Sequence, residues 1–293
     1  MNIRELIKKG VETISVAFPE REAREMVLLY LEDVHGVKRL THILEPSAEV
    51  SAEVAQESQA AFFRMASGEP IQYIIGKAHF YGREFNVSPS VLIPRPETEI
   101  LCREVLNHYV QKRAVCPEPK VLDMCSGSGC IAWTLALEMT RAKVTAVDIS
   151  DGALNVAASQ DFTSEAATRP SFVKADVLGD IPDGIAQTSF DIIVSNPPYV
   201  MDSEKALMRS NVLEHEPHLA LFVPDDDPLI FYRAVARWAS QLLSCGGFGI
   251  VEINEALGTQ TADVFREAGF INVEVISDLN DRERFVRFQK NFV

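Results

Sequence analysis

The sequence is short of cysteine, and the few that it has exclude several classes of protein. Its five cysteines are odd in number and irregularly spaced, at positions 102, 116, 125, 130 and 245, and no Cys-x-x-Cys pair occurs. A disulfide framework, a zinc-finger site and a thioredoxin-like redox motif are therefore not indicated. We expect reduced thiols and no bound metal.

Positive charge and long apolar runs are also scarce. Lys and Arg total 28 against 42 Asp and Glu, for a net charge of −14. Such a chain repels phosphate backbones, which disfavours a broad nucleic-acid surface and favours a protein or small-molecule substrate. No apolar run approaches the roughly 20 residues of a membrane helix, and the charged start "MNIRELIKKG" lacks the apolar core of a signal peptide. We expect a cytoplasmic protein with no membrane contact, and a monomer.

The first part of the chain reads as helical. With 293 residues, of which 47% are hydrophobic, about two domains are expected. Apolar residues recur at helical spacing in "REAREMVLLYLEDVHG", which ends at Gly36, and Ser51 is a helix N-cap before "AEVAQESQAAFFRMASGEP". We predict a small helical bundle over residues 1–70. The aromatic and β-branched segment 71–96, with turn signals at Gly76 and Gly82, predicts a β-hairpin linker.

Strand and helix patterns alternate in the remainder, residues 97–293, after a first helix from Glu97. The seven strand candidates are "KVLDM", "KVTAVDI", "SFVKAD", "FDIIVSN", "GFGIVEI", "NVEVIS" and "RFVRFQ". Alternation predicts an α/β fold, a mostly parallel Rossmann-like sheet with helices on both faces. The last two strands follow one another closely, so we expect one of them to run antiparallel.

A glycine-rich turn follows the first of these strands, in "VLDMCSGSGC" (121–130). Gly127 and Gly129 let the backbone approach a ligand, and the next helix offers free N–H groups. Asp148 ends the second strand, where a carboxylate can bind ribose hydroxyls; Asp176 and Val177 end the third, beside the place of an adenine. Together they predict a nucleoside site. The alternative is that the glycines merely tighten a turn and the aspartates cap helices.

The kind of nucleoside follows from what the turn lacks. It is not a P-loop, because GxxxxGK[ST] is missing, nor the full GxGxxG of dinucleotide enzymes. A nucleoside without phosphates suggests S-adenosylmethionine as the cofactor, with S-adenosylhomocysteine as the product.

The fourth strand ends in "SNPPY" (195–199). The Asn196 side-chain oxygen and the Pro197 carbonyl are acceptors that rigid prolines hold in place, and they suit a planar –NH2 group on which Tyr199 stacks. The alternative is an ordinary Asn-Pro turn with a core tyrosine.

Longer segments resemble one known family. "DMCSGSG" with "NPPY" is similar to methyltransferases that modify planar amino groups, and "GEPIQYIIGKAHFYGREFNVSPSVLIPRPETE" resembles the HemK/PrmC family, the glutamine N5 methyltransferases of peptide chain release factors. "VLEHEPHLALF", "GGFGIVEI" and "DLNDRERFVRF" are similar to the same family, so the resemblance covers essentially the whole chain. It implies an S-adenosylmethionine-dependent methyltransferase domain, with the N-terminal bundle recognising class I release factors.

The resemblance also implies roles for single residues. Asn196 and Pro197 would bind the amide of the glutamine in a Gly-Gly-Gln loop, with Pro198 and Tyr199 beside it and with Arg95 and Glu97 over the site. The cofactor would be lined by Cys125, Ser126, Gly127, Ser128, Gly129, Asp148, Asp176, Val177 and Asn196. Cys125 departs from the family, which has glycine there, and it would be strained if the position needs a positive φ, with a modest loss of cofactor affinity.

Three other functions are weighed against this one. An N6-adenine methyltransferase of DNA or RNA shares the NPPY motif, but the acidic charge disfavours it. A ribosomal-protein glutamine methyltransferase also shares NPPY, whereas "RPETE" fits the release-factor enzymes better. A binding module without catalysis is disfavoured by the intact NPPY.

Overall fold

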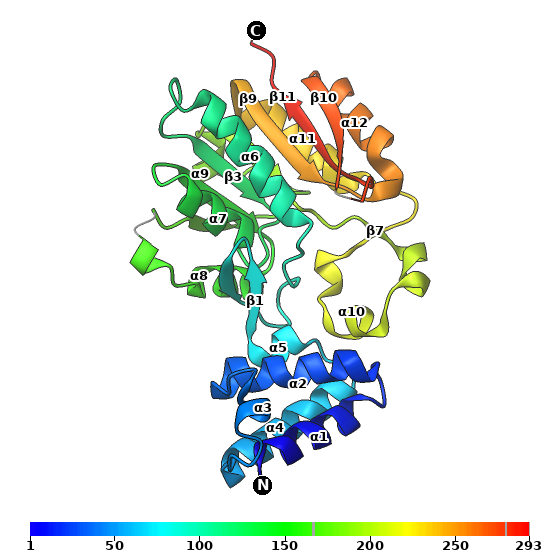
Figure 1. Cartoon of the computed structure of the whole chain (residues 1–293). Coiled ribbons are helices and arrows are strands. Elements are labelled where there is room, and N and C mark those ends of the chain that lie inside the picture. Colours follow the sequence, from blue (N-terminus) through cyan, green and yellow to red (C-terminus); the bar gives the residue numbers. More distant parts are fainter. Residues whose placement is uncertain (166–167, 279, 293) are drawn as a thin grey trace. The chain divides into compact units, whose positions relative to one another are not determined.

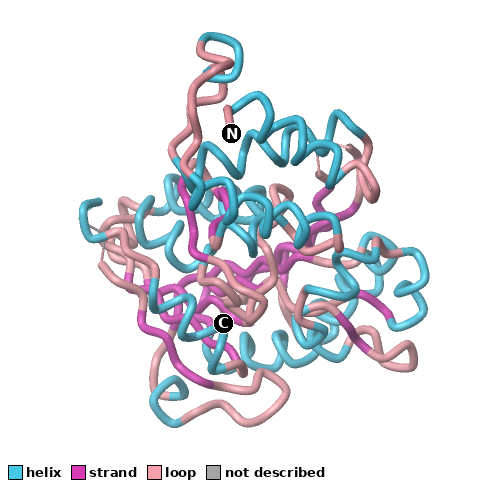
Figure 2. The backbone as a smooth tube through the Cα atoms, turned by 90° about the horizontal axis from the view of Figure 1, so that it is seen from below, coloured by secondary structure: helices cyan, strands magenta, loops and turns pink. Residues whose placement is uncertain are grey.

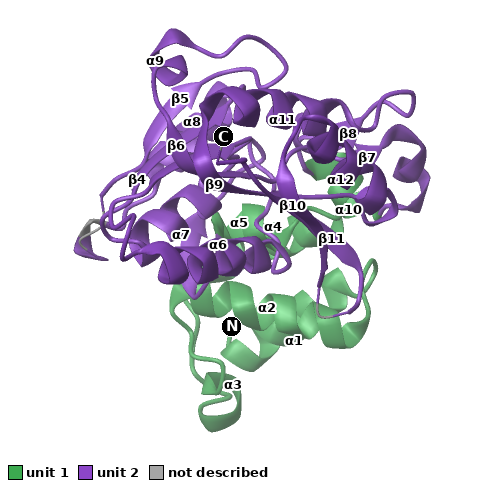
Figure 3. Cartoon of the chain, turned by 90° about the horizontal axis from the view of Figure 1, so that it is seen from above, with its two compact units in different colours: residues 1–77, 209–215 green, residues 78–208, 216–293 purple. Residues whose placement is uncertain are grey.

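The chain divides into two compact units (Figure 3), and a computed structural model describes residues 1–165, 168–278 and 280–292. Unit 1 holds residues 1–77 and 209–215, and unit 2 holds residues 78–208 and 216–293. Each unit has a hydrophobic core of its own. Leu279, in the C-terminal segment "DLNDRERFVRF", lies outside the described residues.

Unit 1 is helical. Its helices are α1 (Ile3–Ile14), α2 (Glu20–His35), α3 (Thr41–Leu44), α4 (Ala52–Ala66), α5 (Ile71–Ile75) and α10 (Ser210–His215). The buried side chains of α1, α2 and α4 form one core, which includes Leu6, Val27 and Phe62. The apolar periodicity of the sequence therefore gives the expected bundle.

Local signals set the ends of these helices. Gly36 follows α2 with a φ of 67°, and the Ser51 hydroxyl accepts the Val54 N–H at 3.2 Å at the start of α4. Both ends are the predicted ones. Helix α1 begins with a capping box, in which Asn2 and Glu5 each accept the other's backbone N–H.

The hairpin is shorter than the segment 71–96. It consists of β1 (Lys77–Phe80) and β2 (Arg83–Asn86), whereas residues 71–75 form α5. Pro70 precedes this helix and Gly76 ends it with a φ of 81°, so the two residues enclose a single helical turn. The isoleucines at 71, 74 and 75 pack against the unit 1 core, and this burial outweighs their preference for a strand.

Unit 2 is built on a seven-stranded sheet. Its strands are β3 (Lys120–Met124), β4 (Lys143–Asp148), β5 (Ser171–Lys174), β6 (Phe190–Ser195), β9 (Leu243–Glu252), β10 (Ile271–Ser277) and β11 (Glu283–Gln289). Their order in space is β10-β11-β9-β6-β3-β4-β5. The pairs from β5 to β9 are parallel, and β11 is antiparallel to both neighbours. The predicted strands and the antiparallel exception are confirmed.

Helices cover both faces of this sheet, and the strands run side by side between them (Figures 1 and 2). α6 and α7 pack on one face, and α11 and α12 on the other. The helices are α6 (Thr98–Lys112), α7 (Cys130–Glu138), α8 (Asp151–Ser159), α9 (Asp183–Ala186), α11 (Ile230–Leu242) and α12 (Gly258–Glu267). Among the described residues, none of the chain's helices is both long and apolar enough to cross a membrane.

Short elements complete unit 2. They are the strands β7 (Val200–Met201) and β8 (Phe222–Val223), which pair in parallel, and the 3-10 helices η1 (Thr163–Glu165), η2 (Asp202–Leu207), η3 (His218–Ala220) and η4 (Glu255–Leu257).

The strand order changes direction at β3. The chain continues from β3 outward through β4 to β5, and then returns to form β6 on the other side of β3. Loops after neighbouring strands diverge at such a point, and a crevice opens at the carboxyl ends of the strands. The glycine turn, Asp148, Asp176 and the segment 195–199 all lie at or just after the carboxyl ends of these four strands.

Candidate active site

The turn after β3 bends sharply through residues with positive φ. The angle is 61° at Cys125, 53° at Gly127 and 76° at Gly129. Space also excludes a side chain at Gly129, because a Cβ there would lie 2.9 Å from the Ala157 Cβ. The turn therefore packs closely on α8 and leads directly into α7, which begins without a side-chain cap.

Asp148 at the end of β4 is tied to this turn. Its Oδ2 accepts the Gly127 N–H at 2.8 Å, and its Oδ1 accepts the Ser150 N–H at 2.9 Å. Burial raises the pKa of this carboxyl, and the N–H groups of Ser150 and Gly127 oppose the rise. Each carboxylate oxygen has a further lone pair, so Asp148 can still accept hydrogen bonds from two hydroxyl groups.

The loop after β5 is held by one arginine. Arg237 of α11 donates to the carbonyls of Val177, Leu178 and Gly179 at 3.2, 3.2 and 2.6 Å. Asp176 accepts the Leu178 N–H at 2.9 Å, and the Val177 side chain is buried. The third strand end thus presents a fixed apolar side chain next to a carboxylate.

The segment 195–199 is fixed where it leaves β6. The Ser195 hydroxyl donates to the Met124 carbonyl at 2.7 Å, which ties the ends of β6 and β3 together. Asn196 Nδ2 donates to Thr98 Oγ1 at 3.3 Å. This hydrogen bond uses the Nδ2 of the amide and not the acceptor Oδ1. Asn196 also lines the pocket described below.

The exit of the segment is fixed as well. The N–H groups of Tyr199 and Val200 both donate to the Leu221 carbonyl, at 3.2 and 2.9 Å, and Asn254 Nδ2 donates to the Tyr199 carbonyl at 3.1 Å. The Tyr199 hydroxyl donates to Glu252 Oε1 at 3.1 Å. With Pro197 and Pro198 between these anchors, the backbone has little freedom to rearrange.

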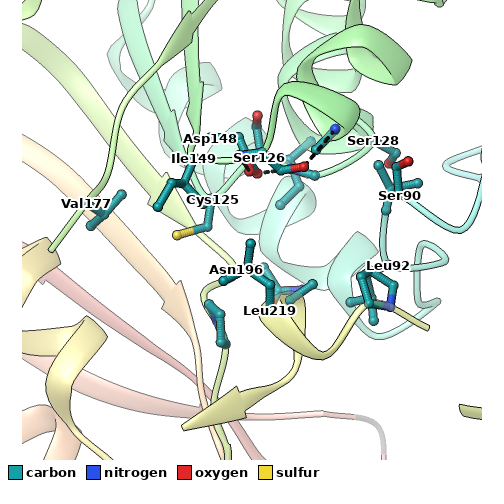
Figure 4. Close-up of a pocket in the computed structure, with 18 of the residues that line it drawn as sticks. Ser90, Leu92, Cys125, Ser126, Ser128, Asp148, Ile149, Val177, Asn196 and Leu219 are labelled. Atoms are coloured by element: carbon teal, nitrogen blue, oxygen red, sulfur yellow. Dashed lines mark hydrogen bonds between the residues drawn. The ribbon is translucent and has the colours of Figure 1, made fainter. Parts of the chain in front are cut away.

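These strand ends surround one pocket (Figure 4), which encloses about 1120 Å³ with its open mouth included. Residues 125–128, Asp148, Val177 and Asn196 line it from the strand ends. Ser90, Leu92 and Arg95 line it from the segment before α6, and Leu219 and Ala220 from η3. A largely apolar pocket with a few convergent polar groups is typical of a small-molecule site.

Comparisons with known proteins agree along nearly the whole chain. Residues 5–76 match the family model of the PrmC N-terminal domain, and residues 101–219 match that of the methyltransferase small domain. The release factor glutamine methyltransferase of Bacteroides thetaiotaomicron is 40% identical over 275 residues, which are 94% of this chain and 95% of that protein. The enzyme of the same name from Bacillus subtilis is 37% identical over an alignment of 293 positions, which covers 97% of this chain and 96% of that protein.

This chain belongs to the release factor glutamine methyltransferase family. A more distant likeness adds the fold alone: the solved catalytic domain of hMettl16 has a TM-score of 0.52 at 15% identity, over 84% of each chain. The family resemblance found in the sequence is thereby confirmed, and so is the α/β methyltransferase fold.

The structure brings most of the predicted site residues of this family member together. The pocket is lined by residues 125–128, Asp148, Asp176, Val177, Asn196, Pro198 and Arg95. Four predicted residues do not line it: Gly129 packs against α8, the Pro197 side chain is buried, Tyr199 packs on the core and contacts Glu252, and Glu97 is exposed at the start of α6. The roles that the family resemblance implies for all of these residues stay predictions.

Arg95 has a partner inside the protein. Its guanidinium donates to Glu216 Oε1 at 2.6 Å, and the Ile93 N–H donates to Oε2 of the same buried carboxylate at 3.2 Å. Glu216 thus holds the segment before α6 against the start of the loop 217–220, and both segments line the pocket. The predicted contact of Arg95 with the substrate would have to coexist with this ion pair.

Sequence reasoning missed two polar residues that are linked to Asn196 by hydrogen bonds, and one of them, Thr98, also lines the pocket. Thr98 lies in the first turn of α6, and Glu252 is the last residue of β9; each is 2% exposed. Glu252 could have been found by the rule that located Asp148, because it also ends a central strand. Thr98 belongs to "RPETE", but no signal in the sequence shows that a residue so distant along the chain would meet Asn196.

Proposed function

We propose that this chain transfers the methyl group of S-adenosylmethionine to the side-chain amide nitrogen, N5, of the glutamine in the Gly-Gly-Gln motif of class I peptide chain release factors. Family membership supports the reaction, and one observation supports the site. Asn196 lines the pocket at the carboxyl end of β6, and its Nδ2 is hydrogen-bonded to Thr98.

The pocket suits a nucleoside cofactor that has no phosphates. Asp148 offers a carboxylate for ribose hydroxyls, and Ile149 and Val177 offer apolar side chains for a base. Among the described lining residues the only cation is Arg95, which is paired with Glu216, so nothing is left to neutralise a diphosphate. When bound, S-adenosylmethionine supplies a methyl group attached to a positively charged sulfur.

Asn196 would act on the glutamine amide. An amide nitrogen is a poor nucleophile, because its lone pair is delocalised into the carbonyl group. The Asn196 Oδ1, with the Pro197 carbonyl as the second predicted acceptor, would accept the two N–H hydrogens and return electron density to nitrogen. These hydrogen bonds strengthen as positive charge develops on the nitrogen, so they stabilise the transition state more than the bound substrate.

The rigid surroundings of Asn196 add an orientation effect. The segment is anchored by Met124, Leu221 and Asn254, so its acceptors need not reorganise when the substrate arrives. Correct placement of the reacting groups can lower a barrier by up to about 7–11 kcal/mol in ideal cases. The surplus proton can leave to water after transfer, so these residues need to supply neither a general base nor a nucleophile.

Methyl transfer itself tests the proposal. The full-length enzyme is incubated with labelled S-adenosylmethionine and a purified release factor, beside a copy whose Gly-Gly-Gln glutamine is changed to alanine. Label on the intact factor alone is expected. Label on DNA or on a ribosomal protein instead, or on both copies of the factor equally, would reject the proposed acceptor.

The Asn196→Ala variant tests the role of the carboxamide. Loss of one preorganised group that stabilises a transition state costs about 10²- to 10³-fold in kcat. We expect a loss of this size, with the calorimetric Kd of S-adenosylhomocysteine within about threefold of the wild-type value. Equal losses in turnover and in cofactor affinity would place Asn196 in cofactor binding rather than in catalysis.

A further inference from the structure

A chain of hydrogen bonds runs from Asn196 into the protein. Asn196 Nδ2 donates to Thr98 Oγ1 at 3.3 Å, and Thr98 Oγ1 donates to Glu252 Oε2 at 2.7 Å. The other carboxylate oxygen, Oε1, accepts from the Tyr199 hydroxyl at 3.1 Å. Glu252 is therefore linked by neutral hydroxyl groups to the first and the last residue of the Asn-Pro-Pro-Tyr segment.

The donors and acceptors in this series of hydrogen bonds fix the direction in which each hydrogen is donated. Burial raises the pKa of Glu252, whereas the hydrogen bonds from Thr98 and Tyr199 and the charge of Arg284 oppose the rise and favour the ionised form. An ionised carboxylate can only accept hydrogen bonds, and a threonine hydroxyl has a single hydrogen to donate. Because that hydrogen is directed to Glu252, Thr98 Oγ1 can offer Asn196 only a lone pair. The Asn196 group that faces Thr98 must then be its NH2, and its Oδ1 must face the other way.

We infer that Thr98 and Glu252 are positioning residues, which set the orientation of the Asn196 carboxamide so that its oxygen is presented to the substrate amide. This inference rests on the proposed function of Asn196. In the reversed orientation the Asn196 NH2 would meet the NH2 of the glutamine, and two donors would face each other without an acceptor. The two orientations of the carboxamide differ by only a half turn of its planar group, so without these hydrogen bonds to Thr98 and Glu252 nothing in this chain of contacts would select one of them.

Burial makes the arrangement firm. Thr98 and Glu252 are each 2% exposed, so water has little access to replace one partner by another. They also come from separate elements, the start of α6 and the end of β9, and β9 lies next to β6 in the sheet. An unmet buried carboxylate oxygen is costly, which favours keeping both hydroxyl donors directed to Glu252.

The first test removes the Thr98 hydroxyl without changing the shape of the side chain. Thr98→Val is expected to lower kcat about 10- to 30-fold, less than the direct loss of a transition-state group. KM for the release factor and Kd for S-adenosylhomocysteine should stay within about threefold. Thr98→Ser retains the hydroxyl and should restore kcat to within about threefold of the wild-type value. Thr261→Val is the matched control, because Thr261 is fully buried and its hydroxyl has no hydrogen-bond partner among the described residues.

The second test uses Glu252→Gln, which replaces one of the two acceptor oxygens by a donor. We expect a similar loss of kcat, about 10-fold. The kcat of the double variant Thr98→Val, Glu252→Gln should lie within about threefold of the kcat of the less active single variant, because both changes act through one carboxamide. Independent roles would instead multiply the two losses, and that result would overturn the inference.

A spectroscopic readout separates this inference from the proposed function. In protein labelled with 15N-asparagine, the side-chain NH2 signals of Asn196 are identified by their absence in Asn196→Ala. They should shift in Thr98→Val and stay in place in Thr261→Val. If wild-type enzyme does not methylate the release factor, the proposed function fails but the shift still tests the orientation. Unmoved signals or an unchanged kcat in Thr98→Val would overturn the positioning role.

Discussion

Cys125 has a side chain at a position whose backbone conformation favours glycine. Its φ of 61° lies in the left-handed region, where a residue with a Cβ is disfavoured by about 1–2 kcal/mol. The strain should lower the stability of the fold, and the modest loss of cofactor affinity expected from the sequence stays a prediction. Burial raises the pKa of the thiol, so Cys125 stays protonated and is a poor nucleophile.

Replacing Cys125 by glycine should stabilise the protein slightly. Relief of about 1–2 kcal/mol is partly offset by the greater freedom of glycine in the unfolded chain, about 0.4–1 kcal/mol. We expect a net gain of about 0.5–1 kcal/mol in the free energy of unfolding, measured with urea. Cys125→Ala keeps the Cβ and should show no such gain.

The same pair of variants decides how Cys125 affects the cofactor. Its side chain lines the pocket, so any effect on affinity should come from the sulfur (Figure 4). Cys125→Gly and Cys125→Ala should then share one Kd for S-adenosylhomocysteine. A lower Kd in the glycine variant alone would show instead that the backbone at 125 moves when the cofactor binds.

At the scale of single elements, α1 in unit 1 depends on a close approach at Gly10. A Cβ at this position would lie 2.7 Å from the Phe62 ring and 2.8 Å from Val27. Alanine in a helix is favoured over glycine by about 1 kcal/mol, but overpacking a tight core costs about 1–3 kcal/mol. Since Phe62 is only 1% exposed and cannot swing outward, the clash should prevail.

Gly10→Ala should therefore destabilise unit 1 by up to about 2 kcal/mol, read from the urea transition in far-UV circular dichroism. Gly184→Ala in α9 is the matched control, because nothing lies within 4 Å of a Cβ there. We expect that control to be neutral or slightly stabilising. Equal destabilisation by both changes would show that packing at Gly10 is not the cause.

The elements also show what a sequence reveals and what it conceals. The strands of unit 2 were predictable because buried strands form short apolar runs between turn signals, and the helix ends at Gly36 and Ser51 because caps are local. Helix α5 was not, since "IQYII" has strand composition and becomes helical only by packing on the unit 1 core.

The site divides in the same way. Gly127, Asp148 and Asn196 could be located from the sequence because each lies at or just after the end of a strand, and parallel strands bring their carboxyl ends together. Thr98 and Glu252 could not be paired with Asn196 in advance. Thr98 and Asn196 are separated by 98 positions in the sequence, and Thr98 and Glu252 by 154 positions. Only the folded structure brings such distant residues together.

At the scale of the whole molecule, the two units differ in what they can bind. Every described residue that lines the pocket belongs to unit 2, and so do both tryptophans, Trp133 and Trp238. Unit 1 contributes a separate core around Leu6, Val27 and Phe62. Cofactor binding should therefore stabilise unit 2 directly, whereas recognition of the release factor by unit 1 stays a prediction from the family resemblance.

A ligand that binds only the folded state stabilises it by about 2.7 kcal/mol at 100 times its Kd. With S-adenosylhomocysteine at that excess, the urea midpoint seen by tryptophan fluorescence should rise. Hydrogen exchange should slow around 121–129, 144–148 and 192–196, and amides of α1, α2 and α4 should exchange as before. Equal slowing in both units would mean that they unfold as one cooperative body. In that case Gly10→Ala should also lower the fluorescence midpoint, whereas with independent units it should leave that midpoint unchanged.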